Sequence, residues 1–410
     1  MQQQELIPHL FRTEFSKITA VLCRLFGIEH MQAAEDLTSE TFLAAVETWP
    51  YKGIPANPTA WLYTVAKNKA HNYIKRSQLF THKIAPELKK EDSAASMPEI
   101  DLSEQNITDS QLQMLFAVCH PALPAEAQVG LALRILCGFG IEEIATALLS
   151  SKEAIEKKLY RAKEKLRNEK AAIVFPGKEE TASRLDAVLT TLYLLFNEGY
   201  YSESSDNIIR EDLCYEAMRL MALLIENEQT RLPQVYALLS LMCFHASRFA
   251  ARRNASGEII LYNDQDEKLW NQELITKGVY YLNRASEGPL LTKYHLEAGI
   301  AYWHTIKADT TEKWDAILQL YNRLLQVAYS PVAALNRTFA LSKVYGKQAA
   351  ITEAEKLQLN KNHYYFTLLG ELYTGIDNTK ALVNFTSAYA LAKTPADKKT
   401  IKEKMQQSQG

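Results

Sequence analysis

The sequence predicts an all-α protein with several domains, and three observations carry that prediction. Apolar residues recur at helical spacing in long stretches, such as RLDAVLTTLYLLF (184–196) and LCYEAMRLMALLI (213–225). Glycine and proline, which interrupt helices, number only 15 and 13 in 410 residues. A chain of this length usually folds as about two or three domains.

The first informative segment is AEDLTSETFLAAVETW (34–49), which predicts an amphipathic helix with an acidic face. Phe42, Val46 and Trp49 recur at helical spacing, so we expect them to form a buried stripe. The acidic side chains point away from that stripe and stay in water. Such a face is either simply solvated or a docking surface for a protein.

A proline-containing loop follows, and WLYTVAKNKAHNYIKR (61–76) then predicts a second helix that becomes strongly basic. Trp61 begins its apolar side, whereas the rest of the segment carries four positive charges and no acid. Asn68 and Tyr73 are among the amides and flat rings that interleave with the charges and suit contact with bases. The pattern favours nucleic-acid binding, since a merely solvated helix usually mixes charges of both signs.

Together the two segments resemble region 2 of bacterial extracytoplasmic-function (ECF) sigma factors. The usual pattern there is A-E-D-L-x-Q-E-x-F and then W-L-x-x-x-A-x-N-x-x-x-D-x-x-R-R, from which this chain departs at Ser39 and Asn72. The resemblance implies that the acidic helix docks on the β′ coiled coil of core RNA polymerase through Asp36, Glu40 and Phe42. It also implies that the basic helix reads the minus-ten promoter element, with these contacts: Trp61, Asn68, Asn72, Lys75 and Arg76.

A second DNA-binding unit is predicted at 124–170, where an apolar helix over 125–136 is opened by Pro124 and broken by Gly138 and Gly140. IEEIATALL, the turn SSK and EAIEKKLYRAKEKLR then predict a helix-turn-helix, with Ser150 or Ser151 as the N-cap. Residues 152–170 hold eight basic and four acidic side chains, a balance that favours phosphate contact. Two short helices around a turn are also a common structural motif without DNA. Four side chains are expected to face the core: Ile155, Leu159, Ala162 and Leu166.

EEIA followed by RAKEKLR resembles region 4 of the same family, which reads the minus-thirty-five element. The DNA contacts that this resemblance implies are Lys152, Glu156, Lys157, Lys158 and Arg161, although Glu156 replaces a residue that is usually basic. Between the two regions, 84–107 predicts a flexible tether. In related sigma factors this linker runs through the RNA exit channel, where the following acids would stand in place of RNA phosphates: Glu91, Asp92, Glu99 and Asp101.

The C-terminal part predicts helical repeats. Three helix pairs begin around Lys293, Pro331 and Asn362, some 31 to 38 residues apart, close to the tetratricopeptide period of about 34. A non-repetitive bundle is the alternative. Alanines are expected where neighbouring pairs touch: Ala298, Ala301, Ala340, Ala381 and Ala388. With HPALPAEAQ and LYLLFNEGY, these repeats resemble the sigma-factor group that has a long C-terminal tetratricopeptide extension.

The segment 184–287 has no clear repeat but carries clusters of polar residues. These clusters would line a ligand pocket, or they would be helix caps and buried ion pairs. The candidates are Asn197, Glu198, Arg210, Asp212, Arg219, His245, Arg248, Arg252, Asp264, Gln265 and Asp266.

Enzyme and metalloprotein classes find little support in the sequence. The five cysteines form no CxxC pair and have no histidine at ligand spacing, which argues against zinc sites and disulfides. No Gly-rich phosphate loop, GxSxG or HExxH motif is present. The start lacks the layout of a signal peptide, and no apolar run approaches 18 residues. We therefore expect a cytoplasmic protein with no cofactor, no metal and no catalytic residue.

These observations predict a transcription initiation factor rather than an enzyme. Its expected partners are core RNA polymerase through the β′ and β subunits, promoter DNA, and a protein or peptide on the repeats, with no membrane. The alternatives are a helix-turn-helix regulator with a ligand-sensing tail and a helical enzyme. The expected domains are region 2 (1–83), the linker (84–107), region 4 (108–172), a helical extension (173–288) and the repeats (289–410).

Overall fold

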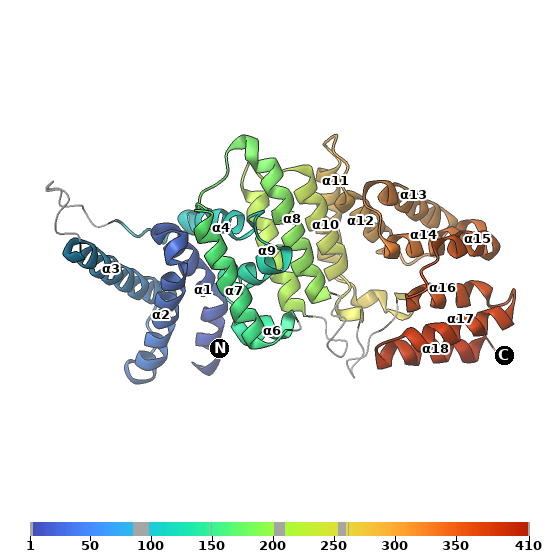
Figure 1. The fold of residues 1–410 in the computed structure, drawn as a ribbon, viewed down its shortest axis with the longest axis horizontal. Helices are drawn as coiled ribbons and strands as arrows, with labels where there is room; N and C mark the ends of the chain where they lie inside the picture. Colours follow the sequence, from blue (N-terminus) through green and yellow to red (C-terminus); the bar gives the residue numbers. More distant parts are fainter. Residues whose placement is uncertain are drawn as a thin grey trace. The chain divides into compact units, whose positions relative to one another are not determined.

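The computed structural model describes residues 3–84, 98–148, 150–200, 210–252, 260 and 262–408. Helices and turns make up these residues, and none of them lies in a strand (Figure 1). The all-α prediction is confirmed. The chain divides into two compact units, Met1–Arg231 (unit 1) and Leu232–Gly410 (unit 2), which we describe separately.

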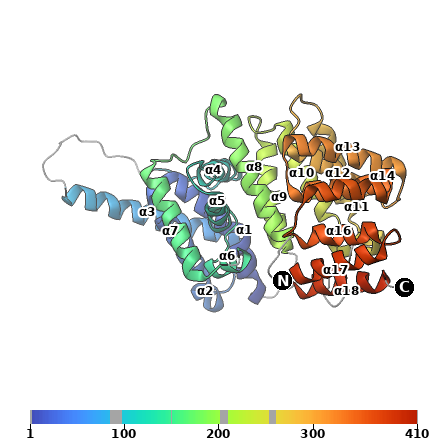
Figure 2. The same ribbon diagram turned by 45° about the vertical axis from the view of Figure 1, so that its right-hand side comes forward.

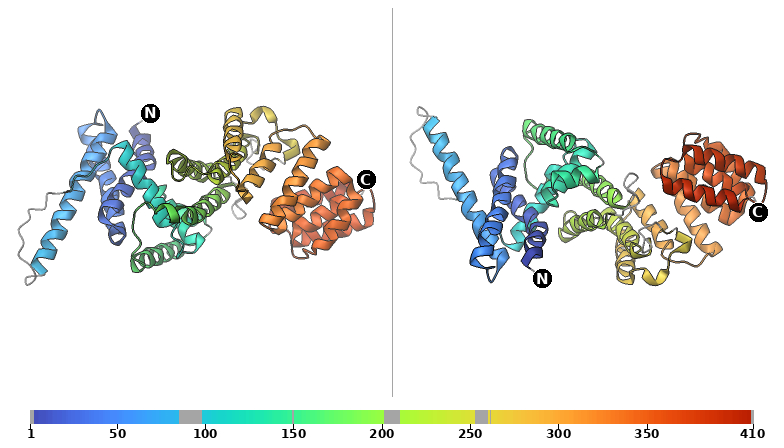
Figure 3. Two further views of the ribbon diagram at one scale, coloured as in Figure 1. Left: turned by 90° about the horizontal axis from the view of Figure 1, so that it is seen from above. Right: turned by 90° about the horizontal axis from the view of Figure 1, so that it is seen from below.

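Unit 1 begins with three long helices: α1 (Gln3–Phe26), α2 (Met31–Lys52) and α3 (Pro58–Ile84). A short 3-10 turn, η1 (Ile28–His30), joins α1 to α2. It follows Gly27, whose φ of 83° is a conformation that glycine adopts without strain. Beyond its contact with α1 and η1 at Tyr73, α3 extends away from α1 and α2, as the views in Figures 1 and 3 agree.

The other helical segments described in unit 1 are α4 (Glu104–Val118), α5 (Ala125–Leu131), the π-helical η2 (Ala132–Leu136), α6 (Ile141–Ala147), α7 (Lys152–Asn168), α8 (Lys178–Tyr200) and α9 (Glu211–Glu226). Of these, η2 directly continues α5. Pro124 precedes the helix over 125–136, as expected, but the second half of that helix, η2, has π-helical geometry. The predicted tether is shorter than expected, because the Ser103 hydroxyl caps α4 and residues 104–107 form its first turn. Of the four linker acids, Glu91 and Asp92 lie outside the described residues.

Unit 2 opens with α10 (Pro233–Ala246) and α11 (Gln272–Ala285), with three short 3-10 turns between them, η3 (Ala250–Arg252), η4 (Tyr262–Asp264) and η5 (Glu267–Leu269). Seven helices follow: α12 (Lys293–Trp303), α13 (Thr311–Val327), α14 (Pro331–Tyr345), α15 (Lys347–Leu357), α16 (His363–Tyr373), α17 (Asn378–Leu391) and α18 (Pro395–Gln407). Consecutive helices pack side by side, most clearly α16, α17 and α18 (Figures 1 and 2).

The three expected helix pairs coincide with α12–α13, α14–α15 and α16–α17. The first helices of these pairs start 38 and 32 residues apart. Pro331 and Pro395 each occupy the first turn of a helix, where a missing N–H costs nothing. The five alanines expected at helix contacts are all buried. One apolar core runs through all three pairs, from Leu296 on α12 to Ile401 on α18.

Candidate polymerase and promoter interfaces

The α2 helix carries acidic residues outside and aromatic residues inside. Asp36 is exposed and accepts a hydrogen bond from Gln32 Nε2 at 2.9 Å. Glu40 is also exposed, and its carboxylate pairs with Lys69 Nζ on α3 at 2.8 Å. Phe42, expected with them at the polymerase surface, is only 4% exposed and packs among the phenylalanines of α1. Phe42 therefore supports the helix from inside, and of the three candidates only the two carboxylates are exposed.

The stripe expected to be buried on α2 is only partly correct. Phe42 and Trp49 are buried, but Val46 is 49% exposed. With 3.6 residues per turn, Val46 stands about 40° to one side of Phe42, whereas Trp49 stands about 20° to the other. The buried neighbours Thr38 and Ala45 lie on the side of Trp49. The helix is thus rotated toward that side, which leaves Val46 in water.

The α3 helix presents one polar face. Asn68, Asn72, Lys75 and Arg76 are exposed and recur at i, i+4, i+7 and i+8, so they lie on one side of the helix. Trp61 is half-buried, and its ring meets that of Trp49 edge to face at 5.4 Å between centroids. The structure therefore groups the four polar candidates and ties Trp61 into the junction between α2 and α3.

Two tyrosines of α3 make contacts within unit 1 that hold the helix in position. The Tyr63 hydroxyl donates to Glu14 Oε2 at 2.6 Å, and burial together with this bond raises the pKa of Tyr63. Tyr73, expected to offer a face to bases, lies against Phe26 and bonds His30 Nδ1 at 2.9 Å. Its ring is thus committed to the contact with α1 and η1.

The α7 helix separates an apolar side from a charged side. Its four expected core residues are all buried, and the hydroxyl of Ser151, one of the two expected N-caps, accepts from Ala154 N at 3.2 Å. Glu156, Lys157 and Arg161 are exposed. The two remaining candidates of α7 each hold a surface ion pair: Lys152 with Glu142 at 2.9 Å and Lys158 with Glu126 at 2.6 Å. Ion pairs this exposed contribute about 0–1 kcal/mol, so a phosphate competes with them readily.

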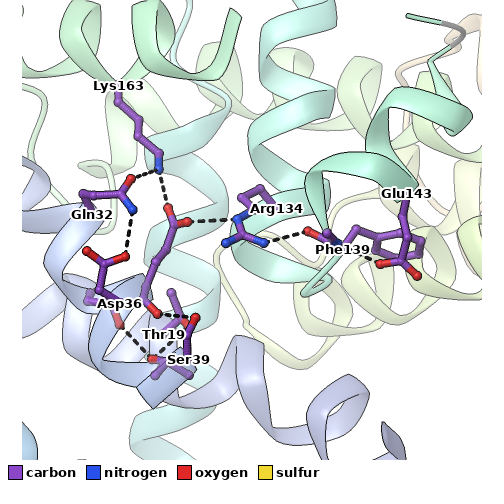
Figure 4. Close-up of polar contacts among 12 residues, drawn as sticks. Thr19, Gln32, Asp36, Ser39, Arg134, Phe139, Glu143 and Lys163 are labelled. Carbon is purple, nitrogen blue, oxygen red and sulfur yellow. Dashed lines mark hydrogen bonds and ion pairs between the residues drawn. The ribbon is translucent and has the colours of Figure 1, made fainter. Parts of the chain in front are cut away.

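Sequence reasoning missed a buried carboxylate, Glu35, which is only 2% exposed. It accepts from Arg134 Nε on η2 at 2.9 Å and from Lys163 Nζ on α7 (Figure 4). Lys163 also donates to Gln32 Oε1 at 2.9 Å, and Arg134 donates to Phe139 O at 3.1 Å. The helical spacing did contain a signal for this burial. Glu35 stands seven residues before Phe42 and therefore lies on nearly the same face of the helix.

Two arginines of the helical extension hold α8 and α9 to the preceding helices. Arg184 on α8 donates to Phe116 O at the end of α4, at 2.7 Å. Arg219 on α9 donates to Leu136 O at the end of η2, at 2.6 Å. Both carbonyls lie in the last turn of a helix, where no intrahelical donor remains for them. Arg219, a pocket candidate, therefore closes a helix end.

The other pocket candidates are divided between the units. In unit 1, Arg210 pairs with Asp212 of the same segment at 3.0 Å. In unit 2, Arg248 is buried and lies over the ring of Tyr262, 5.5 Å from its centroid. Burial, and then the charges of Arg248 and Lys313, lower the pKa of His304 to about 3. The histidine is therefore neutral at pH 7 and acts as a packing residue.

All five cysteines are buried and none forms a disulfide, and burial raises the pKa of the Cys119 and Cys243 thiols to about 12. Nucleophilic use of these two thiols is unfavourable at pH 7. Within the described part of the chain, no three histidine, cysteine or acidic side chains gather as a metal site would require. In the same part, no helix is long and apolar enough to cross a membrane.

Comparison with known proteins connects this geometry to a family. Residues 10–79 match the sigma-70 region 2 family, and residues 184–286 match a family of unknown function, DUF6596. An uncharacterized protein of Rhizobium meliloti, R00370, is 34% identical over 369 residues, which cover 88% of this chain and 87% of the relative. This chain belongs to the same family as R00370. No solved structure matches the chain.

Two sigma factors are similar to about a third of the chain. The ECF RNA polymerase sigma factor BldN of Streptomyces coelicolor is 33% identical over 132 residues, 32% of this chain and 47% of that protein. The ECF RNA polymerase sigma-E factor of Haemophilus influenzae is 27% identical over 138 residues, 32% of this chain and 72% of that protein. With the region 2 match, they support an ECF-type sigma-factor role and point to no catalytic family.

Proposed function

We propose that this protein is a sigma factor that directs core RNA polymerase to specific promoters and helps to open the DNA. The observation that carries the proposal is the sigma-70 region 2 match, which covers most of α1 to α3. The similarity to ECF sigma factors and the exposed basic side of α7 support it. No covalent step is required of the protein, so the proposal includes no catalytic residue and no cofactor.

Polymerase docking is assigned to the exposed acidic side of α2. Asp36 and Glu40 would face the β′ coiled coil, and the buried Phe42 would hold the helix in position. Opposite charges across an interface accelerate association and fix its register. The β subunit is the second proposed contact on core polymerase, and the protein would act in the cytoplasm with it.

Promoter reading is assigned to α3 and α7. The exposed amides and cations of α3 would contact the minus-ten element, and the loop before α3 would help to hold unstacked bases. The N-terminal half of α7 would enter the major groove at the minus-thirty-five element, with Lys157 and Arg161 on phosphates or base edges. Unit 1 carries 25 basic and 32 acidic residues, so binding to free DNA should be weak without polymerase.

The C-terminal part is proposed to regulate these activities. We assign region 2 to α1–α3, region 4 to the helices up to α7, and a repeat module to α12–α18. Stacked helix pairs offer an extended surface that suits a protein or peptide partner. This subdivision follows the helix bounds, the resemblance of the sequence and the match at 184–286.

Transcription in vitro tests the proposal. Core polymerase, the purified chain and a library of genomic fragments are combined without another sigma factor, and the 5′ ends of the transcripts are mapped. Transcripts should start downstream of one shared pair of promoter elements, and core polymerase alone should give none of them. A helix-turn-helix regulator would produce no such transcripts until another sigma factor was added, and that result would replace the proposal by the regulator.

A further inference from the structure

The side chain of Tyr262 is the centre of a polar and aromatic cluster in unit 2. Trp270 stacks on its ring at 6.2 Å between centroids, and the His304 ring meets it edge to face at 5.3 Å. The guanidinium carbon of Arg248 lies 5.5 Å from the centre of the same ring, and Lys313 Nζ donates to the Tyr262 hydroxyl at 3.1 Å. Tyr262 and His304 are half-buried, so the cluster lies just below the surface.

Two cations of this cluster are almost completely withdrawn from water. Arg248 is 8% exposed and Lys313 only 1%. Burial lowers the pKa of Lys313, and the positive charge of Arg248 acts in the same direction. The same two charges add to the effect of burial on His304, which stays neutral. Enclosing like charges in one place is costly unless an anion accompanies them, so a negative charge would stabilise this cluster.

Neither cation forms an ion pair with a carboxylate in the described part of the chain. Lys313 Nζ donates to two neutral oxygens, the Tyr262 hydroxyl and Ile306 O, the latter at 2.5 Å. Arg248 Nε is buried without a hydrogen-bond partner, and so is the indole Nε1 of Trp270. Buried donors in folded proteins nearly always have an acceptor. These two donors therefore need an acceptor that the described residues do not provide.

The acids near the cluster have other partners or lie in water. Asp309 is close enough for its negative charge to favour the protonated form of Lys313. Its carboxylate, however, accepts from Trp314 Nε1 and pairs with Lys343 at 3.1 Å. The other acids between α10 and α12 that adjoin the cluster in sequence are exposed: Asp264, Asp266 and Glu267. The two buried cations thus remain without a directly paired anion from these side chains.

We propose that Arg248 and Lys313 bind the phosphate group of a small molecule, which supplies the missing negative charge. A guanidinium offers a planar fork of donors that matches a phosphate, and a lysine ammonium adds a point charge. A phosphate ester carries a charge of about −1.5 to −2 at pH 7, which balances two cations better than the single charge of a carboxylate does. Lys307, which donates to Gln265 O between η4 and η5, adds a third positive charge to this part of unit 2.

The position of the site predicts an effect on the stability of unit 2. Arg248 follows α10, which packs against α11 and α12, whereas Lys313 lies in the first turn of α13, in the first repeat pair. A phosphate held by both side chains would join these helices and offset the repulsion between the two cations. A ligand that binds only the folded chain stabilises it increasingly as its concentration exceeds the dissociation constant. Phosphate should therefore raise the melting temperature of unit 2.

Isothermal titration calorimetry on the full chain tests the site. The probes are inorganic phosphate, glycerol phosphate as a monoester, and succinate as a dicarboxylate, each at the same ionic strength. Phosphate or its ester should bind saturably at one site per chain. Arg248→Met and Lys313→Met should each weaken this binding about tenfold or more, because each removes a charged donor. The matched control Arg337→Met should leave it unchanged, since Arg337 on α14 already has Asn322 and Glu353 as partners.

Tighter binding of the ester would identify an organic phosphate as the ligand, and equal or weaker binding would identify free phosphate; both results support the site. The proposal is wrong if neither phosphate binds saturably, if succinate binds more tightly than both, or if the Met variants bind like the parent chain. Should the Met variants fail to fold, Arg248→Lys decides, because it keeps the charge without the planar fork and should weaken phosphate binding severalfold. Unchanged affinity of that variant would exclude Arg248 from the site. The titration involves neither polymerase nor promoter, so its failure would leave the proposed function intact.

Discussion

At the scale of single residues, neighbours on α2 meet opposite environments. Glu35 is buried between two cations, whereas Asp36 is exposed and bonds only to Gln32 among the contacts described for it. The sequence predicted the exposed acids because their spacing sets them apart from Phe42. It did not predict the partners of Glu35, since Arg134 and Lys163 are about 100 and 130 residues away and no local pattern encodes such pairing.

Reversal of one exposed charge tests the docking surface. Asp36→Lys should weaken binding to core polymerase at least tenfold, because close charge pairs across interfaces contribute about 1.5–7 kcal/mol. Asp109→Lys is the matched control, since Asp109 accepts the same Gln(i) to Asp(i+4) hydrogen bond on α4, at 3.1 Å. Affinity is measured by titrating labelled protein with polymerase. Equal affinities of both variants would remove Asp36 from the interface.

Two exposed cations test the role assigned to α7. Lys157→Ala and Arg161→Ala should each reduce initiation at promoters that need the upstream element. Each should also lower the slope of log affinity against log salt by about one unit for the holoenzyme. Lys277→Ala on α11, an exposed lysine in unit 2, should change neither quantity. Unchanged slopes for both α7 variants would mean that α7 makes no phosphate contact through these residues.

At the scale of elements, the helices were more predictable than their boundaries. Periodicity located α8, α9 and the repeat helices because each has a continuous apolar face. The predicted tether was too long because the first turn of α4 is polar and follows a serine cap, a pattern that is also typical of loops. The sequence did not predict the attachment of α8 and α9 to α4 and η2. Arginines donate these hydrogen bonds to backbone carbonyls, which carry no sequence signature.

That attachment makes α8 and α9 part of the same packed body as α4 to α7 rather than of a detachable tail. A chain ending at Pro176 should lose several kcal/mol of stability relative to one ending at Arg231. It would expose apolar surface of α4 and α5 at about 25 cal/mol per Å², and it would lose the bonds of Arg184, Thr191 and Arg219.

Thermal unfolding followed by circular dichroism compares the two chains, and a dye that binds exposed apolar surface provides a second measure. The shorter chain should melt at a lower temperature and bind more dye. Identical melting curves and dye binding would show that α8 and α9 fold independently of α4 to α7.

At the scale of the whole molecule, the sequence predicted helical segments along the chain, but it did not predict how α7 packs against α2. Two motif-bearing segments and a repetitive helical tail were visible as patterns. The closed packing of α7 against α2 was not, because it depends on contacts between residues far apart in the chain.

Net charge bears on whether unit 2 shields or assists the sigma regions. From Pro176 onward the chain carries 26 basic and 27 acidic residues, and from Leu232 onward 21 basic and 16 acidic. A domain that covers basic helices by imitating DNA would need strong negative charge. Unit 2 has the opposite balance, which favours a contact required for activity over a shield.

A chain ending at Arg231 tests this role without disturbing α8 and α9. It should keep its fold and its affinity for core polymerase, yet transcribe the shared promoters at least tenfold less than the intact chain. Adding the separate unit 2 should not restore activity if the contact requires the covalent link, because linkage gives an effective concentration in the millimolar range. A gain of transcription would support shielding instead. Equal transcription by both chains would make unit 2 an independent binding module.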